Sequence, residues 1–530
     1  MSRCKWITRS PLVALALFAL LLAGCVRPGP QPPEPPGPPE PTTTAVEDAS
    51  QSSDPGATGT SSVPLIARLG TPVPDYAGQP TPDSAHYEIA HDSASTIGSH
   101  TIVAGETLGT IAQRYSTTVE ELVSLNNLTN PDIIPVGSQL QVPGATIQRV
   151  VSPDLKIIPD SELVYGPTAA DFDLRGFVAA LDGRVVSYQE EVEGQMMDGP
   201  AIVQLVADRY SVGPRLLLAV LEHRAGWITQ AEPPAQPSLL GNNTSGASSL
   251  YIQLSWAANL LNLGYYGRSE GGLRGFNLGE TTQVVFSPTI NDGTAGIQRF
   301  LGAVDGVTYD SWLADVGVGG LYATYNRLFG NPFAYTYEPL RPSDLTAPPL
   351  ELPWSEGETW FYTGGPHGAW NTGSAWGALD FVPAAEQAGC IPSDAWVTAM
   401  APGIVTRSGN GAVVVDLDAG DNKADGFAGT LWAVTYMHLE TRDRIAAGTR
   451  VKTGDRLGHP SCEGGVSDGT HVHLARSFNG RWISADGDVP FEMSGWVSSG
   501  AGAEYDGYLT KGNVSKVACV CREDVNAITR

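Results

Sequence analysis

Basic residues are scarce in this chain of 530 residues, which holds 31 Lys and Arg against 56 Asp and Glu. The formal net charge of −25 argues against a nucleic-acid partner, because contacts to phosphate need clustered cations. An acidic balance mostly favours solubility and says little about fold. One hydrophobic core rarely serves more than about 250–300 residues, so the length predicts several domains.

The apolar run near the N-terminus, "PLVALALFALLLAG", is too short to span a membrane comfortably as a mature helix. Three basic residues precede it, and this order of charge and apolar residues is typical of a secretory signal. The run ends in Leu22-Ala23-Gly24-Cys25, which resembles a bacterial lipobox. The resemblance implies a signal peptide at residues 1–24, lipidation of Cys25 and an extracytoplasmic protein anchored to a membrane. An ordinary signal peptide with a chance cysteine is the alternative.

Cysteine is rare as well, with six in the chain. Signal-peptide cleavage would remove Cys4 and the lipid would occupy Cys25, which leaves cysteines at 390, 462, 519 and 521. An even set in an exported protein favours disulfides, although four cysteines allow three pairings. A bridge between Cys519 and Cys521 would be strained, so we do not assume it. Cys390 with Cys462 is the pair we prefer.

Proline is concentrated after the predicted lipidation site, with nine prolines in the fourteen positions 28–41. Such a segment stays extended, at ~3.1 Å per residue in polyproline II. Ser, Thr, Ala and Pro continue to about residue 98. We therefore expect residues 25–99 to be a disordered linker that holds the folded part away from a membrane.

The first compact unit spans residues 100–143. A β-branched stretch at 101–103 precedes a helical pattern through Leu108, Ile111, Ala112 and Tyr115. A second helix opens at Thr118, with Glu121 placed for a capping box, and "QLQVP" alternates as a strand. This small βααβ unit resembles a lysin motif (LysM) over its whole length. The resemblance implies binding of N-acetylglucosamine-containing glycans, chiefly peptidoglycan.

Residues 155–340 have mostly helical patterns, among them 200–227, where Pro214 suits the first turn of a second helix. Glu222, Gln253 and Tyr325-Asn326 follow one another as in the soluble lytic transglycosylases, which this region resembles. The resemblance implies a lysozyme-like fold in which Glu222 is a general acid with a raised pKa. His223 stands where that family has serine, so we favour a lysozyme-like domain without activity.

From residue 350 to residue 530 the pattern changes to short β-rich runs between glycine and proline turns, which predicts an antiparallel sheet-rich domain. Five of the nine histidines fall here. Side chains two apart on a strand share a face, so His471 and His473 should address one spot, and a neighbouring strand could bring His438 there. Zinc hydrolases commonly use three N or O ligands and leave one position for water.

Three motifs, "GPHGAWNTGSAWGALDF", "YMHL" and "CEGGVSDGTHVHL", resemble the lysostaphin-type zinc metallopeptidases over residues 355–490. Their long His-to-Asp spacing is that of the beta-lytic and staphylolytic branch. The resemblance implies zinc ligands at His367, Asp380 and His473 and a catalytic pair at His438 and His471. It also fits a disulfide cysteine at Cys462. We expect the remaining histidine, His459 on a turn-like segment, to lie at the surface.

The sequence therefore predicts a multidomain, lipid-anchored peptidoglycan hydrolase, a Zn²⁺ endopeptidase that LysM binding concentrates on the cell wall. Tethering a binding module to a catalyst raises the effective concentration of substrate without new contacts. Two alternatives remain. One is a transglycosylase or muramidase that uses Glu222, and the other is a cell-wall scaffold or activator without catalysis.

Overall fold

The computed structural model describes residues 97–103, 105–115, 117–128, 130–131, 134–143, 148–244, 247–279, 282–384, 389–418 and 423–530. The predicted signal peptide, the lipidation site Cys25 and the linker as far as residue 96 lie outside the described residues. Within the described ranges, no helix combines the length and the apolar character needed to cross a membrane.

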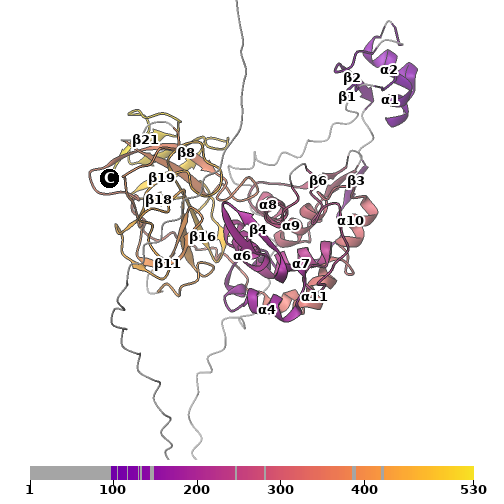
Figure 1. Ribbon diagram of the computed structural model, residues 1–530. Coiled ribbons are helices and arrows are strands. Elements are labelled where there is room, and N and C mark those ends of the chain that lie inside the picture. Colours follow the sequence, from indigo (N-terminus) through magenta and orange to yellow (C-terminus); the bar gives the residue numbers. More distant parts are fainter. Residues whose placement is uncertain are drawn as a thin grey trace, which may run out of the picture. The chain divides into compact units, whose positions relative to one another are not determined.

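The LysM-like unit consists of β1 (Ile97–Thr101), α1 (Leu108–Arg114), α2 (Val119–Asn126) and β2 (Gln139–Pro143), and Figure 1 labels all four elements. The two strands pair in antiparallel register. The predicted order of strand, helix, helix and strand is confirmed. The first strand begins earlier than predicted, so the last residues assigned to the linker belong to β1. The buried core of the unit is formed by Ile102, Leu108, Ile111, Ala112, Leu122, Leu140 and Val142.

Threonines cap both helices of this unit. Thr118 accepts the N–H of Glu121 as predicted, but the Glu121 carboxylate accepts from the Thr117 hydroxyl at 2.6 Å and closes no capping box. The reciprocal box lies at the other helix, where Thr107 and Thr110 bond to each other's backbone N–H. At α1, the hydroxyl of Thr110 therefore fills the capping-box position that we expected Glu121 to fill at α2.

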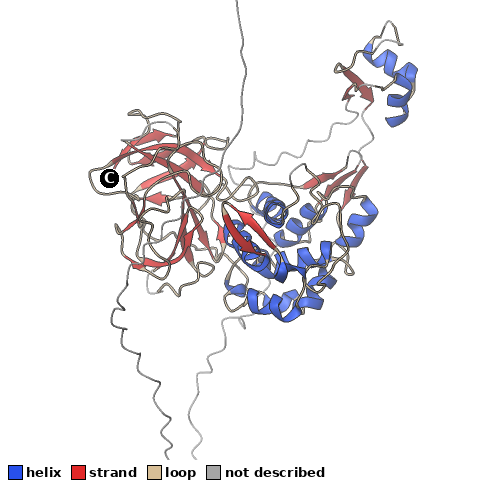
Figure 2. Ribbon diagram, viewed as in Figure 1, coloured by secondary structure: helices blue, strands red, loops and turns tan. Residues whose placement is uncertain are grey.

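In the part of the chain that the structure describes, the helical domain is built from nine α-helices, two short 3₁₀ helices and two small groups of strands (Figure 2). Pro214 begins the second helix of the stretch 200–227, as predicted, and its missing N–H costs nothing in a first turn. Leu216 to Leu221 are wholly buried, so this helix lies in the centre of the domain. The helices of the domain are α3 (Asp160–Leu163), α4 (Leu174–Leu181), α5 (Arg184–Ser187), α6 (Gly199–Tyr210), α7 (Pro214–Ala225), α8 (Leu250–Ser269), α9 (Asp292–Leu301), α10 (Tyr309–Asp315), α11 (Leu321–Phe329), η3 (Pro167–Ala169) and η4 (Pro332–Tyr335).

The strands of this domain form two small sheets. The first sheet joins β3 (Gln148–Val151), β7 (Thr282–Val285) and β6 (Gly275–Leu278), with β3 parallel to β7. The second is the hairpin of β4 (Gln189–Val192) and β5 (Gln195–Asp198).

The C-terminal domain is rich in antiparallel strands, as predicted, and its largest sheet has the order β14-β11-β12-β13-β16-β9-β8-β22 with β17 beside β16. Aromatic side chains, among them Trp354, Trp360 and Phe381, fill its core. A second sheet of four strands, β18 to β21, follows in the chain before β22 returns to the first sheet. The strands are β8 (Thr359–His367), β9 (Ala378–Pro383), β10 (Val397–Thr398), β11 (Gly403–Gly409), β12 (Ala412–Leu417), β13 (Trp432–Met437), β14 (Arg450–Val451), β15 (Arg456–Gly458), β16 (Val472–Phe478), β17 (Arg481–Trp482), β18 (Glu492–Met493), β19 (Trp496–Gly500), β20 (Gly507–Lys511), β21 (Val514–Val517) and β22 (Ala527–Thr529).

Candidate metal centre

The predicted ligands lie on three neighbouring strands of the large sheet. His367 ends β8, Asp380 lies in β9, and His473 lies in β16. β9 runs between the other two, and Asp380 is the direct register partner of His473. Antiparallel pairing places directly opposite side chains on the same face of a sheet, so the register itself brings these groups together.

The three side chains converge on one point. Nε2 of His367 lies 3.0 Å from Nδ1 of His473. Oδ1 of Asp380 lies 3.3 Å and 3.2 Å from the same two nitrogens. His367 and Asp380 are 2% and 9% exposed. These three residues could hold a metal ion.

The hydrogen bonds of the two imidazoles favour a cation at this point. His367 Nδ1 lies 2.7 Å from the carbonyl of Gly365, and His473 Nε2 lies 3.1 Å from the carbonyl of Ala369. A carbonyl can only accept, so each ring places its proton there and presents a bare nitrogen to the other ring. Among the residues that the structure describes, none forms a hydrogen bond to the buried Oδ1 of Asp380. Two lone pairs and a carboxylate oxygen fit the donor set of zinc.

Electrostatics keep the Asp380 carboxyl ionised. Burial alone would raise its pKa, but His367 and His471 outweigh burial and hold the pKa well below its usual range. The backbone of Gly364 leaves room for this carboxylate, since a Cβ at that position would lie 2.6 Å from Asp380 Oδ2. Any larger residue at 364 would therefore displace the carboxylate.

The predicted catalytic pair lies beside these three residues. The rings of His438 and His471 have centroids 4.5 Å apart, and His471 Nε2 lies 3.7 Å from Asp380 Oδ1. His438 Nδ1 bonds to the carbonyl of Glu463 at 3.1 Å, and His471 Nδ1 bonds to that of Gly469 at 2.7 Å. Both rings thus keep Nε2 as a bare acceptor.

His438 has two further features of a functional residue. Its backbone adopts φ 62°, a left-handed conformation that is strained for any residue except glycine. Burial, with His471 and His473 nearby, lowers the pKa of His438 to about 3. Its imidazole is therefore neutral at physiological pH.

Sequence reasoning missed Tyr505, whose ring stacks on His367 with centroids 4.2 Å apart and an interplanar angle of 20°. The backbone of Tyr505 is also left-handed, with φ 69°. Its N–H donates to the carbonyl of Pro366, next to the predicted ligand. No motif surrounds Tyr505 in "AGAEYDG", so the chain offers no signal for this contact before folding.

The loop between His367 and Asp380 contacts the helical domain. The N–H of Gly373 donates to Oδ1 of Asn259 in α8 at 2.8 Å. Trp370 packs edge-on against Tyr210, and the guanidinium of Arg209 lies 5.1 Å from the centroid of the Trp370 ring. The loop is thus fixed by packing and hydrogen bonds from α6 and α8.

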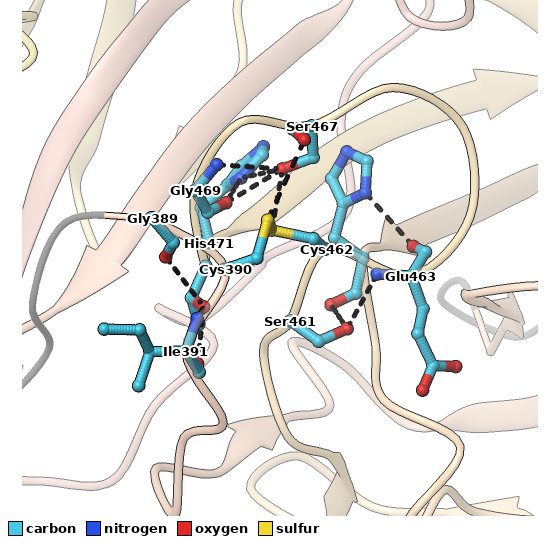
Figure 3. The surroundings of a disulfide bond; sticks show 11 residues. Gly389, Cys390, Ile391, Ser461, Cys462, Glu463, Ser467, Gly469 and His471 are labelled. Carbon is cyan, nitrogen blue, oxygen red and sulfur yellow. Dashed lines mark hydrogen bonds between the residues drawn. A yellow bond between two sulfur atoms is a disulfide. The ribbon is translucent and has the colours of Figure 1, made fainter. Parts of the chain in front are cut away.

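The structure joins Cys390 to Cys462, the pair that we preferred from the sequence. Figure 3 shows this bridge beside His471 and Glu463. The structure also joins Cys519 to Cys521, a bridge that we did not assume from the sequence. A hydrogen bond from the N–H of Cys521 to the carbonyl of Cys519 closes the chain locally and brings their Cα atoms to 5.2 Å.

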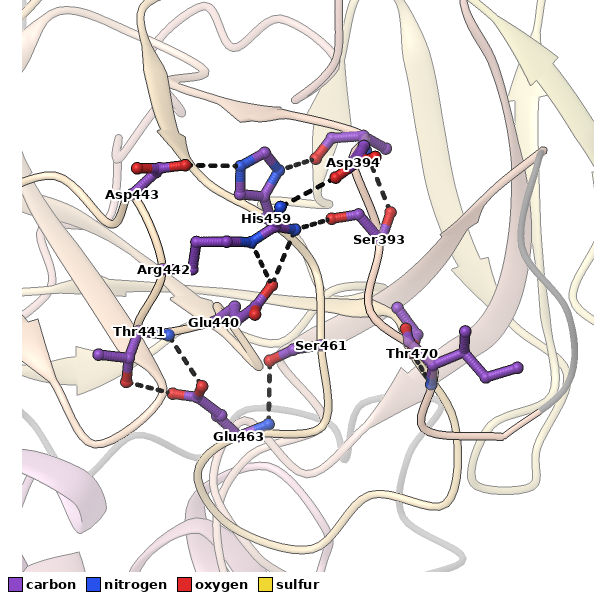
Figure 4. A network of polar contacts seen from close by, with 12 residues as sticks. Ser393, Asp394, Glu440, Thr441, Arg442, Asp443, His459, Ser461, Glu463 and Thr470 are labelled. Carbon is purple, nitrogen blue, oxygen red and sulfur yellow. Dashed lines mark hydrogen bonds and ion pairs between the residues drawn. The ribbon is translucent and has the colours of Figure 1, made fainter.

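The expectation that His459 lies at the surface was also wrong. His459 is 3% exposed, its ring packs on Trp396 with centroids 4.0 Å apart, and Nδ1 lies 2.7 Å from the carbonyl of Ala395. It directly follows β15, whose pairing with β10 brings residues 395 and 396 alongside it. Figure 4 shows His459 within a polar network with Asp443 and Arg442. Glu463 lies at the other end of the same segment, residues 459–463.

The geometry around Glu222 does not suit a general acid. Its carboxylate accepts hydrogen bonds from the N–H groups of Ile228 and Thr229, from the Thr229 hydroxyl and from Arg327. Burial would raise the pKa of Glu222, but these donors lower it below its usual value. The other residues of the predicted motif bond elsewhere: Gln253 to Leu240 and Tyr325 to Glu162.

Comparison with known proteins agrees with this organisation. Residues 100–143 match the LysM domain family and residues 156–342 match the family "LasA, N-terminal domain". The chain is 24% identical over 367 residues to Protease LasA of Pseudomonas aeruginosa (strain PAO1), covering 66% of this chain and 78% of that protein. It is 46% identical over 56 residues to the cell wall-binding protein YocH of Bacillus subtilis (strain 168), covering 11% of this chain and 19% of YocH. A solved structure, "A Novel M23 Metalloprotease Pseudoalterin from Deep-sea", is 26% identical with a TM-score of 0.28, covering 36% of this chain and 100% of that one.

The chain is thus similar to a protease, and it carries three residues that could hold a metal ion. More particularly, it is similar to Protease LasA over 367 residues, and its residues 100–143 match the LysM domain family. The predicted resemblances to LysM domains and to metallopeptidases are confirmed. The lysozyme-like interpretation of the helical domain stays a prediction, since the family that matches this region is the LasA N-terminal domain.

Proposed function

We propose that this protein is an exported, lipid-anchored peptidoglycan hydrolase that cuts peptide cross-links or bridges of the bacterial cell wall in a zinc-dependent reaction. The convergence of His367, Asp380 and His473 on one buried point, with bare nitrogens facing each other, carries the proposal. The LysM domain would bind N-acetylglucosamine-containing glycan and keep the catalyst on its substrate. Cys25 would hold the lipid.

A zinc ion held by these three residues would polarise the scissile carbonyl and lower the pKa of water toward ~7. The chain's own residues would handle the protons. His438, whose Nδ1 bonds to the carbonyl of Glu463, would accept at Nε2 a proton from the attacking water. The ring of His471 lies beside that of His438, with centroids 4.5 Å apart. Its Nε2 is also bare and could hold a proton for the departing amine.

Product analysis of digested peptidoglycan tests the proposal. The wild-type protein should release new amino termini, and His367→Ala or a chelator should abolish them. Anhydromuramyl ends that disappear with Glu222→Ala would instead favour a transglycosylase, and a complete lack of products would favour a scaffold. Retained stoichiometric zinc in His367→Ala would remove His367 from the ligand set.

The lipid anchor needs a separate test. Export of Cys25→Ala in a bacterial host should move the protein from the membrane fraction to the soluble extracytoplasmic fraction, while its activity on purified peptidoglycan stays unchanged. Retention of Cys25→Ala in the membrane fraction would contradict lipidation at this residue.

A further inference from the structure

One loop, residues 461–471, supplies the backbone partners of both histidines of the catalytic pair. The carbonyl of Glu463 accepts from Nδ1 of His438, and the carbonyl of Gly469 accepts from Nδ1 of His471. The partner of Nδ1 decides which nitrogen of a neutral imidazole carries the proton. The position of this single loop therefore sets the tautomer of two rings at once.

We propose that the Cys390–Cys462 disulfide and Ser467 are positioning residues that hold this loop, so that both histidines keep the proton on Nδ1 and direct Nε2 toward the metal centre. This inference rests on the proposed endopeptidase function. It concerns how the two bases are positioned.

The bridge connects two segments that are each held by a pair of hydrogen bonds to backbone carbonyls (Figure 3). On one side of Cys462, the N–H and hydroxyl of Ser461 both donate to the carbonyl of His438, at 2.6 Å and 2.9 Å. On either side of Cys390, the carbonyls of Gly389 and Ile391 accept from the N–H and hydroxyl of Thr470, at 3.0 Å and 2.6 Å. The first pair of hydrogen bonds thus fixes the backbone of His438, and the second pair fixes Thr470, the residue before His471.

Ser467 links the bridge to His471 directly. Its hydroxyl donates to the carbonyl of Gly469 at 2.8 Å, and its oxygen lies 3.3 Å from Nδ1 of His471 and 3.5 Å from Sγ of Cys462. The hydroxyl therefore holds the carbonyl that accepts the hydrogen bond from Nδ1 of His471. Without it, the carbonyl of Gly469 keeps the His471 ring as a donor but loses the hydroxyl that fixes its direction.

The proposed metal ligands do not depend on this loop. His367, Asp380 and His473 are placed by strands β8, β9 and β16, and the rings of the two histidine ligands bond to the carbonyls of Gly365 and Ala369. Loosening the loop should therefore leave metal binding intact while it disturbs the two bases. This separation makes the positioning role measurable.

The test compares zinc-loaded, full-length proteins. The variants are Cys390→Ala/Cys462→Ala, Ser467→Ala, and Ser467→Thr, which restores the hydroxyl. The matched control is Cys519→Ala/Cys521→Ala, which removes the other disulfide and leaves the loop alone. Each protein is measured for zinc content, for kcat and KM on a soluble peptidoglycan peptide, and for the imidazole nitrogens by NMR of ¹⁵N-labelled histidine.

Losing an outer partner of a metal-site residue typically costs ~10–100-fold in activity, and we expect a fall of this size in kcat for the double alanine variant and for Ser467→Ala. KM and zinc content should stay near wild type, Ser467→Thr should recover activity, and the signals of His438 and His471 should show the second tautomer. The control should match the wild type.

Three results would overturn the inference: an unchanged kcat, a loss of zinc together with kcat, or a reduced kcat with unchanged tautomers. If Cys390→Ala/Cys462→Ala does not fold, Ser467→Ala and Ser467→Thr decide the question by themselves. A wild-type protein without zinc-dependent peptide cleavage would refute the proposed function instead, and the tautomer measurement would still decide the positioning role.

Discussion

Nε2 of His367 faces Nδ1 of His473 across 3.0 Å, and each ring donates its N–H to a backbone carbonyl. Two lone pairs at this distance repel each other unless a cation lies between them. Asp380 adds a negative charge at the same point, since its Oδ1 lies within 3.3 Å of both nitrogens. The three side chains would therefore repel one another in a protein core without a cation, and a metal ion would stabilise them.

Asp380→Asn should therefore weaken zinc binding while it preserves the fold. The amide keeps the shape of the carboxylate but lacks its charge, and its NH₂ group cannot bind a cation. The loss in zinc affinity should exceed the ~10–100-fold typical of outer partners. Competition with a chromophoric chelator measures it. An affinity equal to that of the wild type would exclude Asp380 as a ligand.

His438 and His459 should behave in opposite ways when each is replaced by alanine. His438→Ala removes a proposed base, and kcat should fall by ~10²–10⁴-fold with zinc content unchanged. His459→Ala removes ring packing on Trp396 and a buried hydrogen bond, so it should lower the free energy of unfolding by ~1–3 kcal/mol with little effect on kcat. Equal effects of the two variants on kcat would contradict the assignment.

Glu222→Gln should leave peptide cleavage unchanged and destabilise the helical domain. The folded pKa of Glu222 is lowered, so its charge stabilises the fold above the unfolded pKa, and this contribution is lost as the pH falls. At pH 7 we expect a loss of ~1–3 kcal/mol, because the donors from Thr229 and Arg327 lose their ionic partner. Urea unfolding at pH 7 and pH 3.5 should show the difference shrinking in acid.

Asp416 should show the reverse pH dependence. It is 2% exposed, and burial raises its pKa to about 7, above the unfolded value of about 3.9. The folded state therefore binds a proton that the unfolded state has lost, and the stability of the wild type falls as the pH rises from about 4 to about 7.

Asp416→Asn removes this titration and keeps an oxygen for the N–H of Gly426. It should be more stable than the wild type at pH 8 by ~1–4 kcal/mol and close to it near pH 4. Thermal unfolding at the two pH values measures the change. A constant difference between the two proteins would show that the carboxyl does not titrate in this window.

Local periodicity made much of the site predictable. The two-residue spacing of His471 and His473 placed both rings near Asp380 because successive side chains of a strand alternate between its faces. His438 came to the same place because β13 pairs with β16 and brings Met437 opposite His473. The pairing of His367 with Asp380 needed the resemblance to a known family, since a ten-residue loop has no periodicity of its own.

Contacts between distant segments could not be predicted in this way. Tyr505 reaches His367 only because the turn between β19 and β20 folds back on the end of β8. His459 is buried by the pairing of two strands that are too short to recognise in the sequence. The low pKa of Glu222 depends on Arg327, a residue more than a hundred positions away whose approach is set by the packing of α11 on α7.

The origin of the three proposed ligands on β8, β9 and β16 has a consequence for folding. These strands are adjacent, so opening either junction between them would separate ligands, and the release of metal and the opening of the sheet become one linked equilibrium. A ligand at 100 times its Kd adds ~2.7 kcal/mol to the stability of the state that binds it. The melting temperature of this protein should therefore report the free zinc concentration around it.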